Sequence, residues 1–182
     1  MTILVQGARL ADHADRTFTF AEIGAEIGEN PDTLRKFFNG GGLALSPPFD
    51  VVADSGGRGM SHRLHWRSVT LLLLAMKLQE FGFSVRSGDA ARAAGAVFAA
   101  GLGLEHLSSE NSPLIAVDRE GDGSIRVALI ERSAPAGAVE EPRIRDGFPG
   151  VGTMLIDPIG IGRVVWKLAI RQAAEAGEVA GS

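Results

Sequence analysis

The stretch that decides the fold is Phe18-Thr-Phe-Ala-Glu-Ile-Gly-Ala-Glu-Ile-Gly-Glu-Asn-Pro-Asp-Thr-Leu-Arg-Lys-Phe-Phe-Asn39. Its first part places Ile23 and Ile27 on one face and reaches Gly28, which is typical of a short amphipathic helix. A tight turn over 29–32 follows, and residues 33–39 give a second short helix that ends at the glycines 40–42. Two short helices around such a turn predict a helix-turn-helix, whose second helix presents a polar face to a DNA major groove.

The residues of this stretch meet the demands of that motif. Gly24 provides the small side that lets the second helix approach, and Gly28 tolerates the left-handed backbone of the turn. Thr17 and Thr19 are candidate caps of the first helix, and Asn30 with Pro31 suits the start of the second. The apolar positions expected to face inward are Ile23, Ile27, Leu34 and Phe37. The outer face of the second helix then carries Thr33, Arg35 and Lys36.

Composition limits the class of protein. The chain has 182 residues, of which 45% are apolar and 22% charged, as in proteins with a packed core. It has no Cys, which excludes disulfides, thiolate metal sites and a cysteine nucleophile. The first residues lack the features of a signal peptide, and the longest apolar run, 71–76, is far below the ~18 residues that span a bilayer. We therefore expect a cytoplasmic protein without a membrane partner.

The charge is unevenly distributed along the chain. The formal net charge of −4 argues against strong non-specific binding to nucleic acid. Residues 16–92, however, hold nine Lys and Arg against eight Asp and Glu, whereas residues 93–182 hold eight against twelve. Because DNA affinity depends on the face that carries the charge, the first half is where we expect a nucleic-acid surface.

The rest of the first half predicts a loop and two further helices. Residues 40–62 are rich in Gly and Pro, with Phe49, Val51 and Val52 as a candidate strand. Residues 67–81 give the strongest helix pattern, with Ser68 as its cap, Gly82 as its stop and a stripe formed by Leu71, Leu72, Ala75, Leu78 and Phe81. An Ala-rich helix is expected over 88–100, capped by Ser87.

The period of the apolar residues changes near 101–112. We therefore place a boundary there, between a domain at 1–103 and a small αβ module at 112–178. Residues 114–117 and 125–130 flank Gly-Asp-Gly and predict a β-hairpin. Residues 153–156 are a candidate third strand, and Asp157-Pro158 starts a last helix over 159–176. The stripe of that helix, Ile161, Val165 and Leu168, is expected to cover the small sheet. Alternatively, it forms a two-fold interface. The fold class is α+β.

From Ile23 onward the chain resembles the MerR-like winged helix-turn-helix family. The resemblance lies in Ile23 to Gly28, in Thr33-Leu-Arg-Lys-Phe-Phe38, in the Gly and Pro stretch 40–48, in Arg63-Leu-His-Trp66, and in a helix that ends at Phe81-Gly-Phe-Ser84. About 70 residues are covered. The resemblance implies that helix 32–39 enters the major groove and that the segment up to Arg63 is a wing touching the flanking phosphates. The chain departs from the family's sensing members, because it lacks both a long coiled coil and metal-binding Cys.

Other chemistries find weaker support. His62 and His65 have a spacing that suits a metal, but no further ligand stands near them, and Trp66 is expected to fill the core at the base of the wing. The Gly-x-Gly fragments at 147–152 and 160–162 lack the Lys and the Ser or Thr of a phosphate-binding loop and are interpreted as turns. No constellation of nucleophile, base and metal appears, so we expect neither an enzyme nor a cofactor.

The sequence thus predicts a sequence-specific transcriptional regulator that binds double-stranded DNA as a homodimer. Thr33, Arg35 and Lys36 would approach bases or phosphates, and Arg58, Arg63 and Arg67 would hold the backbone. Two alternatives stay open. One is an architectural or packaging DNA-binding protein of the phage type without a sensor domain. The other is an adaptor that uses the helix-turn-helix to bind a protein, which the acidic total charge favours.

Overall fold

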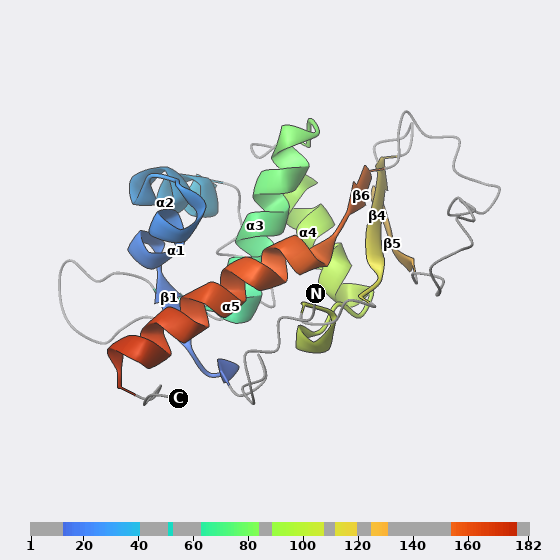
Figure 1. The fold of residues 1–182 in the computed structure, drawn as a ribbon. Helices are drawn as coiled ribbons and strands as arrows, with labels where there is room; N and C mark the ends of the chain where they lie inside the picture. The colour runs from blue at the N-terminus through green and yellow to red at the C-terminus, as the bar shows by residue number, and fades with distance from the viewer. Residues whose placement is uncertain are drawn as a thin grey trace.

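A computed structural model describes residues 13–40, 51–52, 63–83, 89–107, 112–119, 125–130 and 154–177. Over these residues the fold is mixed α+β, with five α-helices and two small three-stranded sheets (Figure 1). The expected α+β class is therefore confirmed. Four residues for which the sequence suggested a role, Phe49, Arg58, His62 and Ser87, lie outside the described residues.

The first sheet joins a strand before the first helix to two strands that follow the second. Its elements in chain order are β1 (Thr17–Thr19), α1 (Phe20–Ile27), α2 (Pro31–Gly40), β2 (Val51–Val52) and β3 (Arg63–His65). The order in the sheet is β1-β3-β2, and both pairs are antiparallel. Because α1 starts at β1 and ends at α2, the sheet and α2 lie at opposite ends of α1 (Figure 1).

Helix α1 and the turn after it follow from local chemistry. Thr19 and Glu22 form a reciprocal capping box at the start of α1. Gly28 ends the helix in the left-handed conformation, with φ of 77°. A Cβ at Gly24 would collide with the main-chain carbonyl of Glu29, so only glycine allows this close approach. The predicted roles of Thr19, Gly24 and Gly28 are confirmed.

Helix α2 begins as predicted but buries a different aromatic ring. The side chain of Asn30 accepts a hydrogen bond of 2.8 Å from the Asp32 main-chain N–H, and Pro31 occupies the first turn. Leu34 and Phe38 are the buried residues of α2, and the Phe38 ring meets the Phe20 ring edge-on at 5.6 Å. Phe37, expected to face inward, packs against the core but is only half-buried, and Phe38 takes the fully buried position. Leu34 and Phe38 are four residues apart and share a face, which leaves Phe37 half-buried at its border.

Helix α3 (Trp66–Glu80) is the centre of the core. It contacts α4 (Asp89–Ala99), β1, β3 and α5 (Pro158–Glu175), and this explains why it is buried on more than one stripe, including every residue from Ser68 to Ala75. The predicted cap at Ser68 is wrong, because the helix starts two residues earlier and buries Ser68 inside it. Phe81 does not belong to the buried stripe. It follows the last turn, is 62% exposed, and precedes Gly82, which ends the segment with a φ of 88°.

The second sheet confirms the predicted hairpin and third strand. Strand β4 (Leu114–Arg119) lies between β5 (Ile125–Ile130) and β6 (Met154–Ile156), antiparallel to both. Alternate residues of β4, Ile115 and Val117, point into the core. Helix α4 packs against β5.

Helix α5 differs from expectation in what it covers. Asp157 caps it, accepting a hydrogen bond of 3.0 Å from the Ile159 N–H, as predicted. Its stripe of Ile161, Val165 and Leu168 is buried mainly against α1, α3 and the 3-10 helix η3 (Leu104–Leu107), rather than on the small sheet. Figure 1 shows α5 running across α3 towards β1. The buried residues of both halves therefore belong to one hydrophobic core.

Two glycines of α5 also correct the sequence interpretation. Gly160 and Gly162 lie in the first turns of the helix and not in a loop. A Cβ at Gly162 would collide with the Leu107 carbonyl, so this glycine lets α5 approach η3 closely. None of the helices in the described ranges has the length and apolar character needed to cross a membrane.

Candidate nucleic-acid interface

The outer face of α2 is polar, as the sequence predicted. Thr33, Arg35, Lys36 and Asn39 are exposed, while Leu34 and Phe38 hold the opposite face in the core. The buried pair fixes the rotation of the helix about its axis, so the outward direction of the polar residues follows from the packing. Thr33, Arg35 and Lys36 are thus brought together on one accessible helix.

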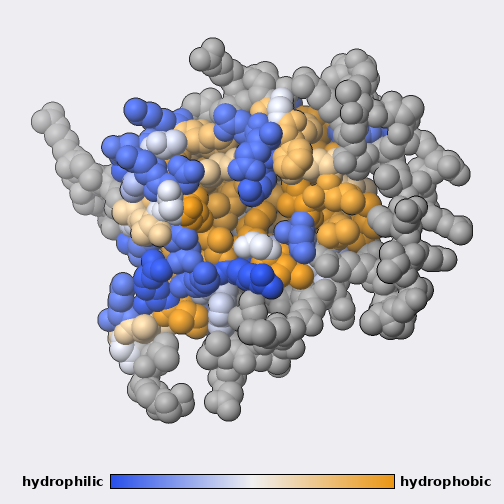
Figure 2. Space-filling model, turned by 45° about the horizontal axis from the view of Figure 1, so that its top comes forward, coloured by the Kyte–Doolittle hydropathy of each residue, from blue (hydrophilic) through white to orange (hydrophobic). Residues whose placement is uncertain are grey.

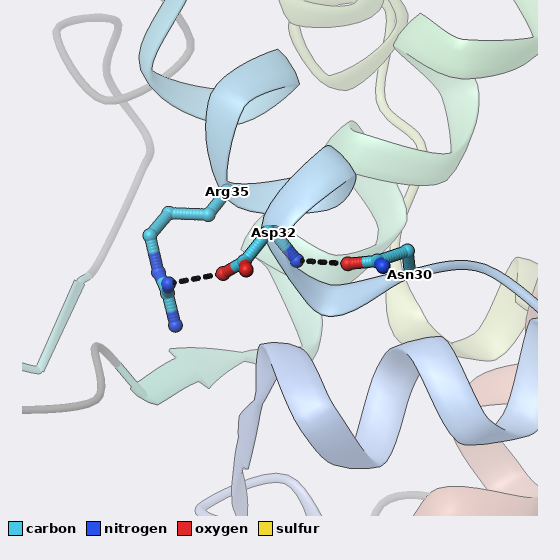
Figure 3. A network of polar contacts seen from close by, with 3 residues as sticks. All are labelled: Asn30, Asp32 and Arg35. Carbon is cyan, nitrogen blue, oxygen red and sulfur yellow. Dashed lines mark hydrogen bonds and ion pairs between the residues drawn. The ribbon is translucent and has the colours of Figure 1, made fainter.

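Arg35 is engaged within its own helix. Its guanidinium forms an ion pair of 2.6 Å with the Asp32 carboxylate, on the outside of α2 (Figure 3). The same guanidinium lies 5.9 Å from the centre of the Phe20 ring. Both partners of the ion pair are exposed, so the pair is worth only a few tenths of a kcal/mol and a phosphate could replace the carboxylate. The sequence reasoning missed this role of Asp32, although its spacing of three residues from Arg35 was a visible signal.

Lys36 is the uncommitted cation of this helix. Its side chain is exposed, and it makes no hydrogen bond or ion pair with any residue that the structure describes. Thr33 is likewise exposed and without such a partner in the same part of the chain. These two residues are available to an external ligand without breaking any interaction described for the protein.

Arg63, by contrast, ties the first sheet together. Its Nε donates to the Thr17 hydroxyl and its Nη2 to the Thr17 carbonyl, both at 2.9 Å. The Nε2 of Gln172 donates to the same carbonyl at 2.9 Å, which joins α5 to β1. The guanidinium predicted to hold phosphates is thus already occupied by the main chain and side chain of β1.

The carboxylates of α1 are also committed inside the protein. Glu26 has a side chain that is only 7% exposed, and it forms ion pairs with Arg171 at 2.6 Å and Lys167 at 3.3 Å, both on α5. Glu22 accepts a hydrogen bond of 2.7 Å from Gln172 on the same helix. Neither of these two carboxylates is a free negative charge beside α2, whereas Glu29 and Asp32 are exposed at the start of that helix.

The environment of Glu22 changes its acidity. Burial by itself raises the pKa of this carboxyl, but hydrogen bonds from Gln172 and from the N–H and hydroxyl of Thr19, together with the Arg63 charge, outweigh burial and hold the pKa below its ordinary value. The two Thr19 bonds measure 2.6 and 2.7 Å. Glu22 therefore stays ionised and links the start of α1 to α5.

The two groups of predicted DNA contacts lie apart. Arg67 is exposed on the first turn of α3, beside the first sheet, whereas Lys36 is on α2 at the other end of α1. The eight residues of α1 span about 12 Å between those ends. On the face drawn in Figure 2, hydrophilic residues gather on the side where α1, α2 and the end of α5 lie, and hydrophobic ones lie towards the middle.

Metal chemistry finds no support in the described ranges, where no three His, Asp or Glu side chains come close enough to share an ion. Trp66 is buried, as expected for a residue that fills the core. No protein-family profile matches the sequence, and no curated protein is detectably similar to it.

Proposed function

We propose that the protein is a sequence-specific DNA-binding regulator of the MerR-like winged helix-turn-helix type. In this proposal α2 is the recognition helix, α1 is its support, and β2 and β3 are the base of the wing. The proposal depends on one observation: α2 has one face buried in the core and an opposite face that is polar and exposed. Leu34 and Phe38 anchor the helix, and Thr33 and Lys36 are left exposed and uncommitted next to a replaceable Arg35–Asp32 pair.

The roles of the cations follow from their surroundings. Lys36 contacts a phosphate or base directly, and Arg35 joins it by exchanging Asp32 for a phosphate, which the small free energy of the exposed Arg35–Asp32 pair allows. Arg63 acts indirectly by holding β3 to β1. Arg67, on the first turn of α3, is assigned to a flanking phosphate, and the same role is proposed for Arg58 from the sequence. The family assignment and Arg58 depend on the sequence resemblance.

Charge substitutions on α2 test the proposal. Affinity for a labelled duplex of random sequence is measured by anisotropy over a range of salt concentrations. Binding through about four phosphates per subunit predicts that log K falls with log salt at a slope near −4. Lys36→Glu should weaken binding and reduce the slope by about 1. Asp32→Asn should strengthen it, because it removes a negative charge and frees Arg35.

Matched controls keep this test specific. Arg163→Glu makes the same charge change as Lys36→Glu, but on the exposed side of α5, and Glu175→Gln removes a carboxylate from the last turn of α5. Both should leave affinity nearly unchanged. If the controls shift binding as much as the α2 variants do, or if folded protein binds no duplex at low salt, α2 is not a recognition helix.

The adaptor alternative has an observation in its favour. Of the predicted contacts in the described part of the chain, Arg35 is paired with Asp32 and Arg63 is occupied by Thr17, so the basic surface is smaller than the sequence suggested. A protein partner would then dock on the same face of α2. In that case Asp32→Asn would not produce tighter DNA binding, and Lys36→Glu would change affinity for the partner instead.

A homodimer is part of the proposal, because one short recognition helix touches few base pairs and a two-fold axis doubles the contact. The α5 stripe cannot supply the interface, since the protein buries it internally. The interface is assigned instead to the outer face of the second sheet, where Leu155 is 42% exposed. Sedimentation of the full chain and of Leu155→Glu tests this. A wild-type monomer at tens of micromolar would exclude the dimer.

A further inference from the structure

A pocket of about 570 Å³ lies where the first turn of α3 meets α4 and the residues that follow α4. It is an open depression rather than an enclosed cavity, so a bound ligand would stay partly exposed to solvent. Trp66 and Phe98 form an aromatic wall, Leu102 adds an aliphatic contact, and Arg67 and Glu105 are its charged residues. Neither the helix-turn-helix nor the small sheet requires an opening here.

The aromatic wall suits a planar ring. The Trp66 and Phe98 rings are tilted by 46° to each other, with centres 6.2 Å apart. Trp66 is buried as the first residue of α3, and Phe98 is half-buried on α4. Packing on both sides therefore holds the wall in place, and a ligand ring would reach it mainly at the half-buried Phe98, since Trp66 is buried and Arg67 lies over its ring.

Arg67 gives the pocket an anion-binding group. Its guanidinium lies over the Trp66 ring, 5.4 Å from the ring centre. It has no hydrogen-bond or ion-pair partner among the residues covered by the structure. The contact with Trp66 holds the guanidinium at the pocket, and a guanidinium with an unused fork of donors fits a carboxylate in two-point contact. An aromatic ring and a carboxylate can thus be bound side by side.

Gly95 contributes open space to the lining. It lies within α4, where alanine is the better helix former. A Cβ at this position would meet no atom within 4 Å, so packing does not demand a glycine. The missing side chain leaves room in the pocket, and the position allows the pocket to be filled without straining the core.

We propose that this pocket binds a small aromatic monocarboxylate, with its ring on Trp66 and Phe98 and its carboxylate on Arg67. The carboxylate of Glu105 in the lining disfavours a second negative charge on the ligand. The probe that fits this description is 4-hydroxybenzoate. A bound carboxylate would occupy the Arg67 guanidinium that the DNA-binding proposal assigns to a flanking phosphate, so the two ligands would compete for it. The test of the pocket contains no DNA, and its failure is therefore distinct from a failure of DNA binding.

Calorimetry and ligand-observed NMR on the full chain test the proposal. The matched probes are 4-hydroxybenzoate and its neutral amide, 4-hydroxybenzamide. The acid should bind, and the amide should bind about tenfold more weakly, because it cannot form the charge-assisted contact. Arg67→Gln should weaken the acid by about tenfold and abolish the difference between the probes. Arg163→Gln, an exposed arginine on α5, is the control and should change neither.

A second, independent test fills the pocket by substitution at Gly95. Gly95→Leu should abolish binding, and Gly95→Ala should weaken it, while neither lowers the melting temperature. The Ala variant keeps the test decisive if the larger residue disturbs folding. The proposal is overturned if wild type binds neither probe at millimolar concentration, if Arg67→Gln binds the acid as wild type does, or if the Ala variant folds and binds unchanged.

Discussion

Leu168 offers a direct test of whether the two halves of the chain form one folding unit. It lies on α5, is 1% exposed, and belongs to the core shared with α1 and α3. Leu168→Ala removes the buried side chain beyond Cβ and leaves a cavity, which costs roughly 2–5 kcal/mol. For a chain of this size each kcal/mol lowers the melting temperature by about 2–4 °C. A loss of about 3 kcal/mol should therefore lower it by about 6–12 °C.

The control is a truncation to Ala at an exposed apolar residue. Phe81 follows the last turn of α3 and is 62% exposed, so Phe81→Ala should cost less than about 1 kcal/mol. The chain has two tryptophans, Trp66 on α3 and Trp166 on α5, which report on the two halves. Single-tryptophan variants, with the other replaced by Phe, give separate fluorescence signals in urea unfolding.

One shared core predicts that both signals move together to lower urea in Leu168→Ala. The contrary result is a shift of the Trp166 signal while the Trp66 signal stays at the wild-type midpoint. That result would show that the two predicted domains, 1–103 and 112–178, unfold independently, and that the packing of α5 on α1 and α3 contributes little.

Substitutions at Glu22 and Gly24 test the interactions that hold α1 in place. Because the pKa of Glu22 lies below its ordinary value of 4.5, the stability from its ionised form is present above that value and is lost as pH falls through the lower, folded-state pKa. Glu22→Gln should flatten the acid side of a plot of melting temperature against pH; a profile that keeps the wild-type slope would assign it to other groups. Gly24→Ala should destabilise by more than 1 kcal/mol, about the cost of a strained backbone contact, because its Cβ meets the Glu29 carbonyl. Gly160→Ala, which meets nothing within 4 Å in α5, should be neutral or stabilising by up to about 1 kcal/mol in the same denaturation assay; equal losses in both would refute the role of Gly24.

Features that depend on neighbouring residues could be predicted well. The capping of α1 by Thr19, the left-handed Gly28, the start of α5 at Asp157-Pro158 and the hairpin of β4 with β5 each involve interactions within a few residues or one tight connection. Turn and cap chemistry is local, so the sequence contains the information that selects it.

Features that depend on distant partners were harder to predict. Periodicity placed Phe37 and Phe81 in apolar stripes, but the contact of Phe38 with Phe20 decides which face of α2 is buried, and nothing covers Phe81 enough to bury it. Ser68 looks like a cap only until α3 is seen to begin at Trp66, in continuation of β3. In each case a residue far along the chain, or the strand before the helix, changed the outcome.

The candidate interface likewise has features that the sequence determines and features that only the tertiary structure decides. The sequence by itself determined that α2 turns Thr33, Arg35 and Lys36 outward, because Leu34 must be buried and helical geometry then orients its neighbours. Only the tertiary structure decided which charges are available. Arg63 is occupied by β1, Glu22 and Glu26 are held by α5, and Arg67 lies over Trp66 beside a pocket. The physical reason is that a helix period specifies direction, whereas a charge is neutralised by whatever the fold brings within hydrogen-bond distance, even from 150 residues away.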